Sequence, residues 1–431
     1  MKHARKRHSR FRTRVAGATG VLAVTLGAGV APAAAAGKTT GAPMTTAASL
    51  DEAEAPDAAA TKAPDAPKAP GELSLPAPTG PHRVGTVDLH LRDSSRTDPY
   101  VPGHQRRELM VTLWYPATHT AHYPAAPWMQ PAAAARYLAD RQVPPGSVTL
   151  PTTAGHTGAP VDRTAGTLPV LLYSTGLHGP RAMGTSLAQD LASRGYLVVT
   201  IDHTHQAEAV EFPGGRLEVN TMPPHSHSSD TIAVRAADTH FVIDKLAAIA
   251  HGHNPDVEHK PLPHGLSKAV NTNRIGMFGA SLGGATVPEA MHADSRIDAG
   301  ANLDGQFFGP ATTRDLDRPF LLFSSQNHNR DTDRSWARFW KHLDGERLDL
   351  KLRDSGHNSF VDNQALLPQA PGAFGMSPDQ LVHALGTIDP NRSIEIQRTY
   401  LAAFFDKHLR HRHSHLLDGP SRHYPEIDFI R

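Results

Sequence analysis

A five-residue motif in the second half of the chain has the composition of a catalytic turn. The segment Gly279-Ala280-Ser281-Leu282-Gly283 fits the pattern G-x-S-x-G, in which a tight strand-to-helix turn holds a serine hydroxyl above a sheet. Glycine is needed on both sides because a Cβ there would collide with neighbouring backbone. A serine presented in this way attacks a carbonyl carbon and forms an acyl-enzyme, so Ser281 is the predicted nucleophile.

The sequence around the motif supports this interpretation. A short apolar strand, Arg274–Phe278, precedes it, and a helix begins at Gly284 directly after it, as the motif requires. Two other serines lack that setting, because Ser186 lies at a helix start and Ser267 lies in a polar loop. The context favours Ser281 over a serine that only stabilises a turn.

The serine needs a histidine that accepts its proton, and the chain offers 28 histidines. His357 follows the predicted strand Leu348–Leu352 in a late strand-end loop, where α/β-hydrolases carry their general base. The others gather in polar loops and in the C-terminal tail, and their two-residue spacing without accompanying carboxylates favours solvated surface over a metal site. These clusters are His225 and His227, His251 and His253, and His411, His413 and His415. We predict His357 as the base, and neither a metal nor a cofactor.

The histidine in turn needs a carboxylate that fixes its tautomer and stabilises its charged form. Asp304 directly follows an apolar strand that ends at Leu303, and it stands between serine and histidine in the α/β-hydrolase order. Asp202 ends an earlier strand, which is the wrong order, and Asp354 is too close to His357 in sequence to reach its ring. Asp304 is therefore the predicted acid.

An acyl-enzyme mechanism also requires two backbone N–H groups that bind the oxyanion. One comes from the residue after the nucleophile, here Leu282, and the other from a loop after an early strand. The loop Tyr173–Gly179 contains glycines that let its backbone turn toward the serine, and we predict Leu177 as its donor, with Gly176 or His178 as the neighbouring alternatives. His178 and Phe307 are candidate pocket residues.

Strand and helix patterns alternate along the chain from residue 81. Apolar residues alternate at 86–91 and 109–115, which indicates an antiparallel opening pair. Later apolar runs are typical of buried parallel strands, with amphipathic helices between them. The expected strands are Leu168–Tyr173, Tyr196–Ile201, Ile275–Phe278, one ending at Leu303, Phe320–Phe323 and Leu348–Leu352; the expected helices are Ser186–Ser193, Asp230–Leu246, Gly284–Met291, Asp333–Leu343 and Ile394–Leu409. This predicts an α/β-hydrolase fold, with a mostly parallel central sheet and helices on both faces.

Two segments near the predicted site invite a second interpretation. Trp336, Phe339 and Trp340 share one helix, and their spacing favours packing in the core over a lipid-facing stripe. The Pro- and Gly-rich segment Asn363–Pro390 is a candidate pocket wall, because loops over a strand-end site carry specificity.

The N-terminal segment has the order of an export signal. Residues 1–14 are rich in Lys, Arg and His, residues 15–30 are apolar, and residues 31–36 are small. We predict a signal peptide at 1–36, a disordered Ala- and Pro-rich linker at 37–80 and a catalytic domain at 81–431. The apolar run is too short to span a bilayer, so we expect a secreted protein. The chain has no cysteine, which excludes disulfides and thiol catalysis.

The charge of the chain excludes some classes of partner. With 43 basic and 42 acidic residues the net charge is +1, which gives no general field for nucleic acid or anionic lipid. We expect a small-molecule or lipid ester as substrate, no nucleic acid, and at most transient contact with lipid interfaces. The oligomeric state stays open.

Taken together, several segments resemble the plasma-type platelet-activating-factor acetylhydrolases and their bacterial lipase-like relatives. The resemblance covers most of Pro81–Leu409 and rests on Glu108–Pro116, Ser174–Gly179, Asp190–Tyr196, Gly279–Thr286 and Leu303-Asp304-Gly305. It implies a calcium-independent carboxylic ester hydrolase that prefers short or truncated acyl groups, including those on phospholipids. It places the nucleophile on Ser281, the acid on Asp304, the base on His357 and the oxyanion donors on Leu177 and Leu282.

The resemblance is incomplete in the oxyanion loop. Thr175 and His178 stand where family members often have a histidine and a glycine, so the substrate preference of the eukaryotic enzymes does not transfer. Two alternatives remain open besides a secreted serine esterase. One is an extracellular lipase or polyester depolymerase with the same triad, and the other is a hydrolase-like binding protein that has lost catalysis.

Overall fold

Six parallel strands form the centre of a large sheet. In this computed structural model, which describes residues 71–224 and 226–431, the sheet has eleven strands. The predicted signal peptide and the predicted linker up to residue 70 lie outside the described residues. The central strands, in order across the sheet, are β6 (Leu197–Ile201), β5 (Leu168–Ser174), β9 (Val270–Ala280), β10 (Ile297–Leu303), β11 (Phe320–Ser324) and β12 (Arg347–Leu352).

Further strands extend the sheet on both sides. Next to β6, in order, lie β2 (Arg106–Ala117), β1 (Arg83–Thr97), β4 (Thr152–Thr157) and β3 (Ala125–Pro127), and next to β12 lies β13 (Ile427–Phe429). β1 and β2 pair antiparallel as predicted. A separate hairpin consists of β7 (Ala209–Phe212) and β8 (Arg216–Val219).

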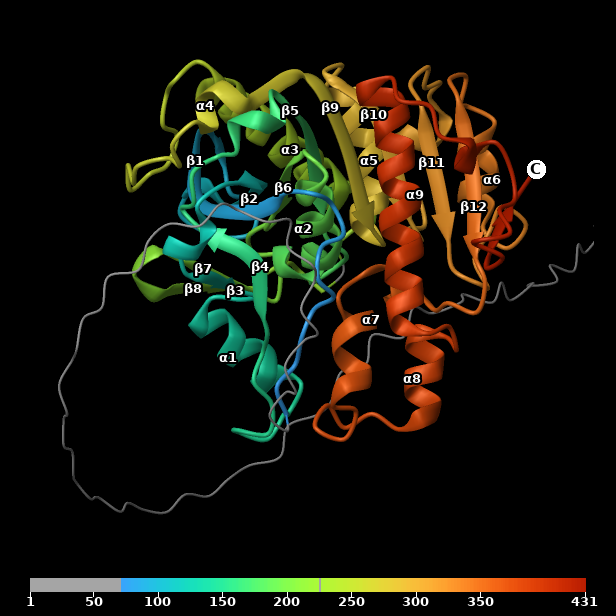
Figure 1. Ribbon diagram of the computed structural model, residues 1–431, viewed down its shortest axis with the longest axis horizontal. Helices are drawn as coiled ribbons and strands as arrows, with labels where there is room; N and C mark the ends of the chain where they lie inside the picture. Colours follow the sequence, from blue (N-terminus) through green and yellow to red (C-terminus); the bar gives the residue numbers. More distant parts are fainter. Residues whose placement is uncertain (1–70, 225) are drawn as a thin grey trace, which may run out of the picture. The chain divides into compact units, whose positions relative to one another are not determined.

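Helices cover both faces of the sheet (Figure 1). One face packs against α2 (Thr185–Ser193) and α9 (Pro390–Arg410); the other packs against α3 (Ser228–Ala250), α5 (Leu282–Ala293) and α6 (Arg334–Trp340). Every residue of β5 is buried, as an apolar strand between two helical layers requires. The predicted parallel sheet with helices on both faces is confirmed, and Trp336 and Phe339 pack in the core as expected.

Four further α-helices lie in the described residues. They are α1 (Pro131–Asp140), α4 (Leu266–Ala269), α7 (Asn363–Leu366) and α8 (Pro378–Leu385). No helix in the described part of the chain has the length and apolar character needed to cross a bilayer.

The folded domain begins earlier than the sequence indicated. Leu73 is buried in a cluster with residues of α1 and α7, and its N–H donates to Thr149 O over 2.9 Å. The Thr79 N–H and hydroxyl both donate to Asp190 on α2, over 2.7 and 2.8 Å. The interpretation of residues 71–80 as linker was therefore wrong, because these residues bury an apolar side chain and satisfy polar groups of the domain.

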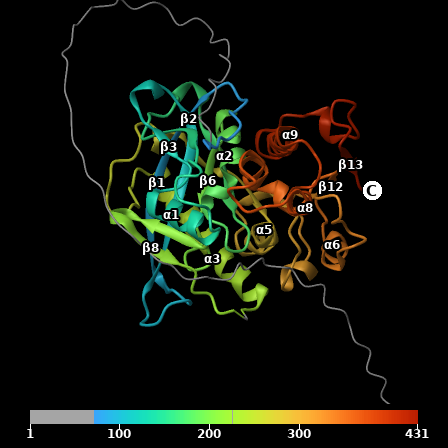
Figure 2. The ribbon, with the colours of Figure 1, turned by 90° about the horizontal axis from the view of Figure 1, so that it is seen from below.

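The carboxyl ends of the parallel strands share one edge of the sheet. The arrowheads of β9 and β11 point toward the lower part of Figure 1, so Figure 2 looks onto this edge. α7 and α8 lie below it, and the loops after β9, β10, β11 and β12 emerge there. In α/β sheets such an edge carries the ligand site.

Candidate active site

Ser281 occupies the sharp turn between β9 and α5. Its backbone has φ 55° and ψ −124°, a conformation that costs a non-glycine residue free energy. The Ser281 N–H donates to Leu303 O over 2.9 Å, which ties the turn to β10. A Cβ at Gly283 would overlap the carbonyl oxygen of Ser174, and a Cβ at Gly279 would overlap the backbone of Gly283. The two glycines of the motif therefore allow the close packing that holds the serine in this conformation.

The structure brings the three predicted catalytic residues together. Ser281 Oγ lies 3.0 Å from His357 Nε2, and His357 Nδ1 lies 2.6 Å from Asp304 Oδ2. The serine follows β9, the aspartate follows β10 and the histidine lies in the loop after β12. His357 has a side chain that is 53% exposed, whereas that of Asp304 is 3% exposed. A substrate can thus reach the serine and the histidine while the carboxylate stays shielded from water.

The carboxylate of Asp304 accepts hydrogen bonds on both oxygens. Oδ1 accepts the Ser325 N–H over 2.7 Å and lies 3.0 Å from His328 Nδ1, so Oδ2 is left for His357. Burial alone would raise the pKa of Asp304, but the hydrogen bonds from His328 and His357 outweigh it and lower this pKa to about 2. Asp304 is therefore ionised at neutral pH.

His328 is a second histidine on the same carboxylate, and the sequence interpretation missed it. It lies in the loop after β11, with Nδ1 on Asp304 and Nε2 2.9 Å from Asp333 Oδ2. A signal was present, because the residue follows a central strand at the edge where sites lie. Among 28 histidines, however, nothing in the sequence distinguished it.

The two rival carboxylates do not contact His357. Asp202 accepts the Arg181 N–H over 2.6 Å and also pairs with the guanidinium of that arginine. It lines a separate cavity of about 370 Å³ that neither Ser281 nor His357 lines. Asp354 is exposed, and its N–H donates to Gln326 Oε1 over 2.9 Å. Both residues have surroundings that fit structural roles.

The predicted oxyanion donors belong to two segments that lie next to Ser281. Leu282 is the first residue of α5, where an N–H has no partner within the helix. In the other loop, Gly176 O accepts from Thr175 Oγ1 over 3.0 Å and from Arg235 Nη2 over 3.2 Å. The C=O and N–H of a trans peptide point in opposite directions, so the anchored carbonyl turns the Leu177 N–H away from Arg235. A Cβ at Gly176 would lie 3.4 Å from Ser281 Cβ, which shows how closely this loop passes over the serine.

A buried polar network supports the oxyanion loop from behind. Ser174, the last residue of β5, has its Oγ 2.9 Å from His203 Nε2, and His203 Nδ1 lies 3.0 Å from Asp238 Oδ2. Arg107 donates to both oxygens of Asp238, over 3.1 and 2.7 Å. Burial lowers the pKa of His203 to about 4, with a further contribution from Arg235, so the ring is neutral. This Ser–His–Asp arrangement is inaccessible to substrate, and it fixes the strand from which the loop begins.

The two candidate pocket residues have different surroundings. His178 is exposed in the oxyanion loop, and its Nδ1 contacts the side-chain amide of Asn220. Phe307 is buried and packs against the rings of Trp336, Phe339 and Phe320. The interpretation of Phe307 as a pocket residue is therefore replaced by a role in core packing.

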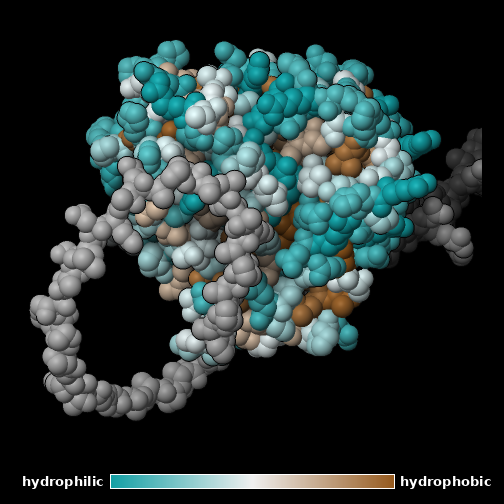
Figure 3. Space-filling view, viewed as in Figure 1, coloured by the Kyte–Doolittle hydropathy of each residue, from teal (hydrophilic) through white to brown (hydrophobic). Residues whose placement is uncertain are grey.

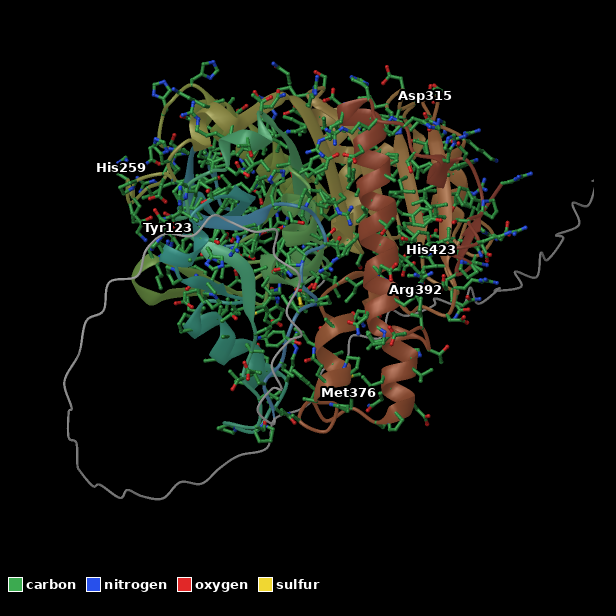
Figure 4. All side chains as sticks on the ribbon, in the orientation of Figure 1. Tyr123, His259, Asp315, Met376, Arg392 and His423 are labelled. Atoms are coloured by element: carbon green, nitrogen blue, oxygen red, sulfur yellow. The ribbon has the colours of Figure 1, made fainter. Side chains whose placement is uncertain are left out.

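The segment Asn363–Pro390 supports the histidine loop. It contains α7 and α8, and Ser359 Oγ donates to Leu385 O at the end of α8 over 2.7 Å. Figure 4 places Met376 at the tip of this segment, away from the sheet. In Figure 3 an apolar patch lies on the same part of the molecule, where Val382 of α8 is 49% exposed. The segment thus packs against the loop that carries His357 and also presents apolar surface.

One group of residues in the described part of the chain could hold a metal ion. Ligand atoms of His413, His415 and Asp418 lie within 4.8 Å of one another on the exposed C-terminal segment. The expectation that these histidines lack a carboxylate was wrong, because Asp418 pairs with His415 over 3.0 Å and with His413 over 3.4 Å. The group is separate from the loops that carry Ser281 and His357.

Comparison with known proteins identifies the class of enzyme. The chain is 36% identical to a ferulic acid esterase from Streptomyces cinnamoneus of known structure, with a TM-score of 0.71, covering 83% of this chain and 99% of that one. It is 30% identical over 390 residues to a probable 1-alkyl-2-acetylglycerophosphocholine esterase of Arthroderma benhamiae, covering 84% of this chain and 95% of the relative. It is 22% identical to the platelet-activating factor acetylhydrolase of Gallus gallus, covering 78% of this chain and 83% of the relative. The fold is thus that of an α/β-hydrolase, and the chain is a carboxylic ester hydrolase.

The family assignment rests on a match along most of the chain. Residues 68–213 and 225–419 match the profile of the family "Platelet-activating factor acetylhydrolase, isoform II". The match includes the turn at Ser281 and the loops that carry Asp304, His328 and His357. The chain therefore belongs to the platelet-activating factor acetylhydrolase isoform II family.

Proposed function

We propose that this protein is an exported serine esterase that hydrolyses short-chain or phospholipid-type esters through an acyl-enzyme on Ser281. The observation that carries the proposal is the hydrogen-bonded chain from Ser281 Oγ through His357 to Asp304, with distances of 3.0 and 2.6 Å. The family resemblance and the accessible serine support it. An inactive binding protein would have no use for a strained serine beside an exposed histidine.

In the proposed mechanism His357 Nε2 takes the proton of Ser281 as the hydroxyl oxygen attacks the ester carbonyl. The Leu177 and Leu282 N–H groups bind the oxyanion that forms. His357 then gives its proton to the departing alcohol, and a water molecule, activated by the same histidine, releases the acid. Asp304 stabilises the charged ring in both halves of the reaction because it accepts the Nδ1–H.

The surroundings of the site support a substrate that is only partly enclosed. Besides the exposed ring of His357, Leu177 in the oxyanion loop is 46% exposed, so apolar surface lies at the entrance. This favours esters whose short acyl group sits at the serine while a larger alcohol moiety extends into solvent. An acetyl group on a glycerophospholipid has this form.

A second substrate class is favoured by a specific observation. The chain is more similar to the ferulic acid esterase than to the fungal phospholipid esterase, at 36% against 30% identity. Aromatic esters such as methyl ferulate are therefore the alternative substrates.

Substrate profiling of the purified protein, with Ser281→Ala as the matched control, tests these proposals. We expect kcat/KM on p-nitrophenyl esters to be highest for acetate or butyrate, to fall at least tenfold by decanoate, and to be lost in the variant. Acetyl-glycerophosphocholine and methyl ferulate, compared at equal concentration, separate the two substrate classes. Highest activity on triglyceride emulsions or polyester films would instead assign the protein to the lipase or depolymerase alternative.

Export is part of the proposal and rests on the sequence of residues 1–36. N-terminal sequencing of protein recovered from the culture medium should give a start near Gly37. Protein that keeps Met1 and stays with the cells would contradict the export signal.

A further inference from the structure

The contacts of His328 assign it a part in the reaction that neither the sequence motifs nor the family match indicates. We propose that His328 is a positioning residue: as an imidazolium held between Asp304 and Asp333, it fixes the orientation of the Asp304 carboxylate and moderates the attraction of that carboxylate for His357. The inference rests on the proposed function of Ser281, His357 and Asp304.

The first step is the charge of the ring. Each ring nitrogen of His328 faces a carboxylate oxygen, over 3.0 Å to Asp304 and 2.9 Å to Asp333. A carboxylate oxygen only accepts hydrogen bonds, so both nitrogens donate only when the ring carries two protons. Burial opposes this charge, but the two carboxylates outweigh burial and raise the pKa of His328 to about 9. The pKa of Asp333 is lowered because the hydrogen bonds from His328 and Ser335 outweigh its burial.

The second step is the rigidity of the clamp. The ring of His328 packs against that of Trp336, with centroids 4.5 Å apart, and the Trp336 indole N–H donates to Gly305 O over 2.7 Å. Asp333 caps α6, because its Oδ1 accepts the Ser335 N–H over 2.7 Å. The ring is thus held by a buried tryptophan and by the first turn of a helix.

The third step is the effect on Asp304. With His328 and the Ser325 N–H on Oδ1, rotation of the carboxylate would break two hydrogen bonds, so Oδ2 stays directed at His357. The imidazolium also contacts Oδ1, the carboxylate oxygen of Asp304 that does not bind His357. A cation there weakens the electrostatic attraction between the carboxylate and a positive charge on His357.

Other charged groups face the same region. Asp349 on β12 is buried and accepts from Arg330 over 2.6 Å; burial raises the pKa of Asp349 to about 6, and the charges of Arg330 and His328 oppose that rise. The remaining groups that face His328 are Asp304, Asp333 and, beyond Asp304, His357. Replacement of His328 therefore removes the charge of the histidine and also an interaction that favours the ionised form of Asp349.

The experiment compares pH profiles of kcat/KM on p-nitrophenyl acetate for the wild-type protein, His328→Gln and Asp333→Asn. Glutamine still donates one hydrogen bond but carries no charge. We expect the midpoint of the acid limb to move upward by about half a pH unit or more in His328→Gln, the direction expected when a neighbouring cation is removed. Asp333→Asn keeps a good helix cap and lowers the stability of the charged ring, so it should move the midpoint in the same direction by a smaller amount. A purely structural role would lower kcat or the melting temperature of both variants and leave the midpoint in place, which would overturn the proposal.

A second measurement does not depend on turnover. In ¹⁵N-histidine spectra of the Ser281→Ala protein, with the His328 signals identified by their loss in the double variant, both ring nitrogens should be protonated between pH 6 and 8. A neutral ring in this range would refute the inference whatever turnover His328→Gln shows. Failure of the proposed function itself would look different, because wild-type turnover would then be absent or would survive Ser281→Ala.

Discussion

Replacement of Asp304 by asparagine should inactivate the protein because it favours the tautomer of His357 that carries its proton on Nε2. The Oδ1 position of Asp304 faces two donors, the Ser325 N–H and His328, so the amide oxygen of the asparagine will occupy it. The amide NH₂ then faces His357 Nδ1, which has to accept and therefore carries no proton. The proton sits on Nε2, directed at Ser281 Oγ, and the histidine is unable to act as a base.

The expected loss follows from this geometry. A triad aspartate replaced by asparagine with the same tautomer consequence lowers kcat about 10⁴-fold, which corresponds to about 5 kcal/mol in the barrier. Here the protonated His328 donates to the Oδ1 position and so hinders rotation of the amide group, and we expect the full loss of about 10⁴-fold. Initial rates on p-nitrophenyl acetate measure it, with circular dichroism to verify folding.

Asp354→Asn is the matched control, because Asp354 is exposed and lies three residues before the base. It should keep activity within about tenfold. Should Asp304→Asn retain nearly full activity while Asp354→Asn or Asp202→Asn is inactive, the assignment of the acid is refuted, although Ser281 and His357 could still stand.

Three further predictions concern stability and cofactors. A protein that starts at residue 71 should keep full activity. One that starts at residue 81 loses the burial of Leu73 and the hydrogen bonds of Thr79, so its free energy of unfolding in urea should be lower by at least about 2 kcal/mol. Equal stability of the two proteins would contradict the packing of this segment. The pKa of His328 in the folded protein is raised from 6.5 to about 9, so the contribution of its charge to stability is fully present below pH 6.5 and is lost as the pH rises through 9. The difference in the free energy of unfolding between the wild-type protein and His328→Gln should therefore shrink over that range. Activity should survive EDTA, because neither Ser281 nor His357 needs a metal in the proposed steps; a loss that zinc or calcium restores would overturn this.

The sequence alone was sufficient to predict those residues whose roles depend on local sequence patterns. Ser281 sits in a motif that needs only the strand before it and the helix after it. Asp304 and His357 each follow an apolar strand. Chain order distinguishes Asp304 from Asp202, and the short separation of Asp354 from His357 excludes Asp354 as the acid. The parallel strands β5, β6 and β11 could be predicted because they are nearly continuous apolar runs, as strands buried on both faces must be.

What the sequence did not reveal depends on contacts between distant segments. β4, with the sequence Thr-Thr-Ala-Gly-His-Thr, has no apolar alternation, and it forms because its backbone pairs with β1 and β3. His328 belongs to the site because the fold places the loop after β11 against Asp304 and against Asp333, the N-cap of α6.

One missed element had a local signal. α8 begins with a capping box, because Ser377 accepts the Gln380 N–H and Gln380 accepts the Ser377 N–H, with Pro378 at the first helical position. The prolines and glycines on either side of this helix outweighed that signal when the segment was interpreted as a loop.

The central claim, a covalent acyl-enzyme on Ser281, can be tested directly by mass spectrometry of the intact protein and of its peptides. The protein is mixed with a slowly deacylated p-nitrophenyl ester, quenched in acid within the burst phase and digested with a protease. We predict one added acyl group, located on the peptide that contains Ser281, and none in Ser281→Ala. An active wild-type protein that carries no acyl group at any quench time, or carries it on another residue, would contradict the mechanism.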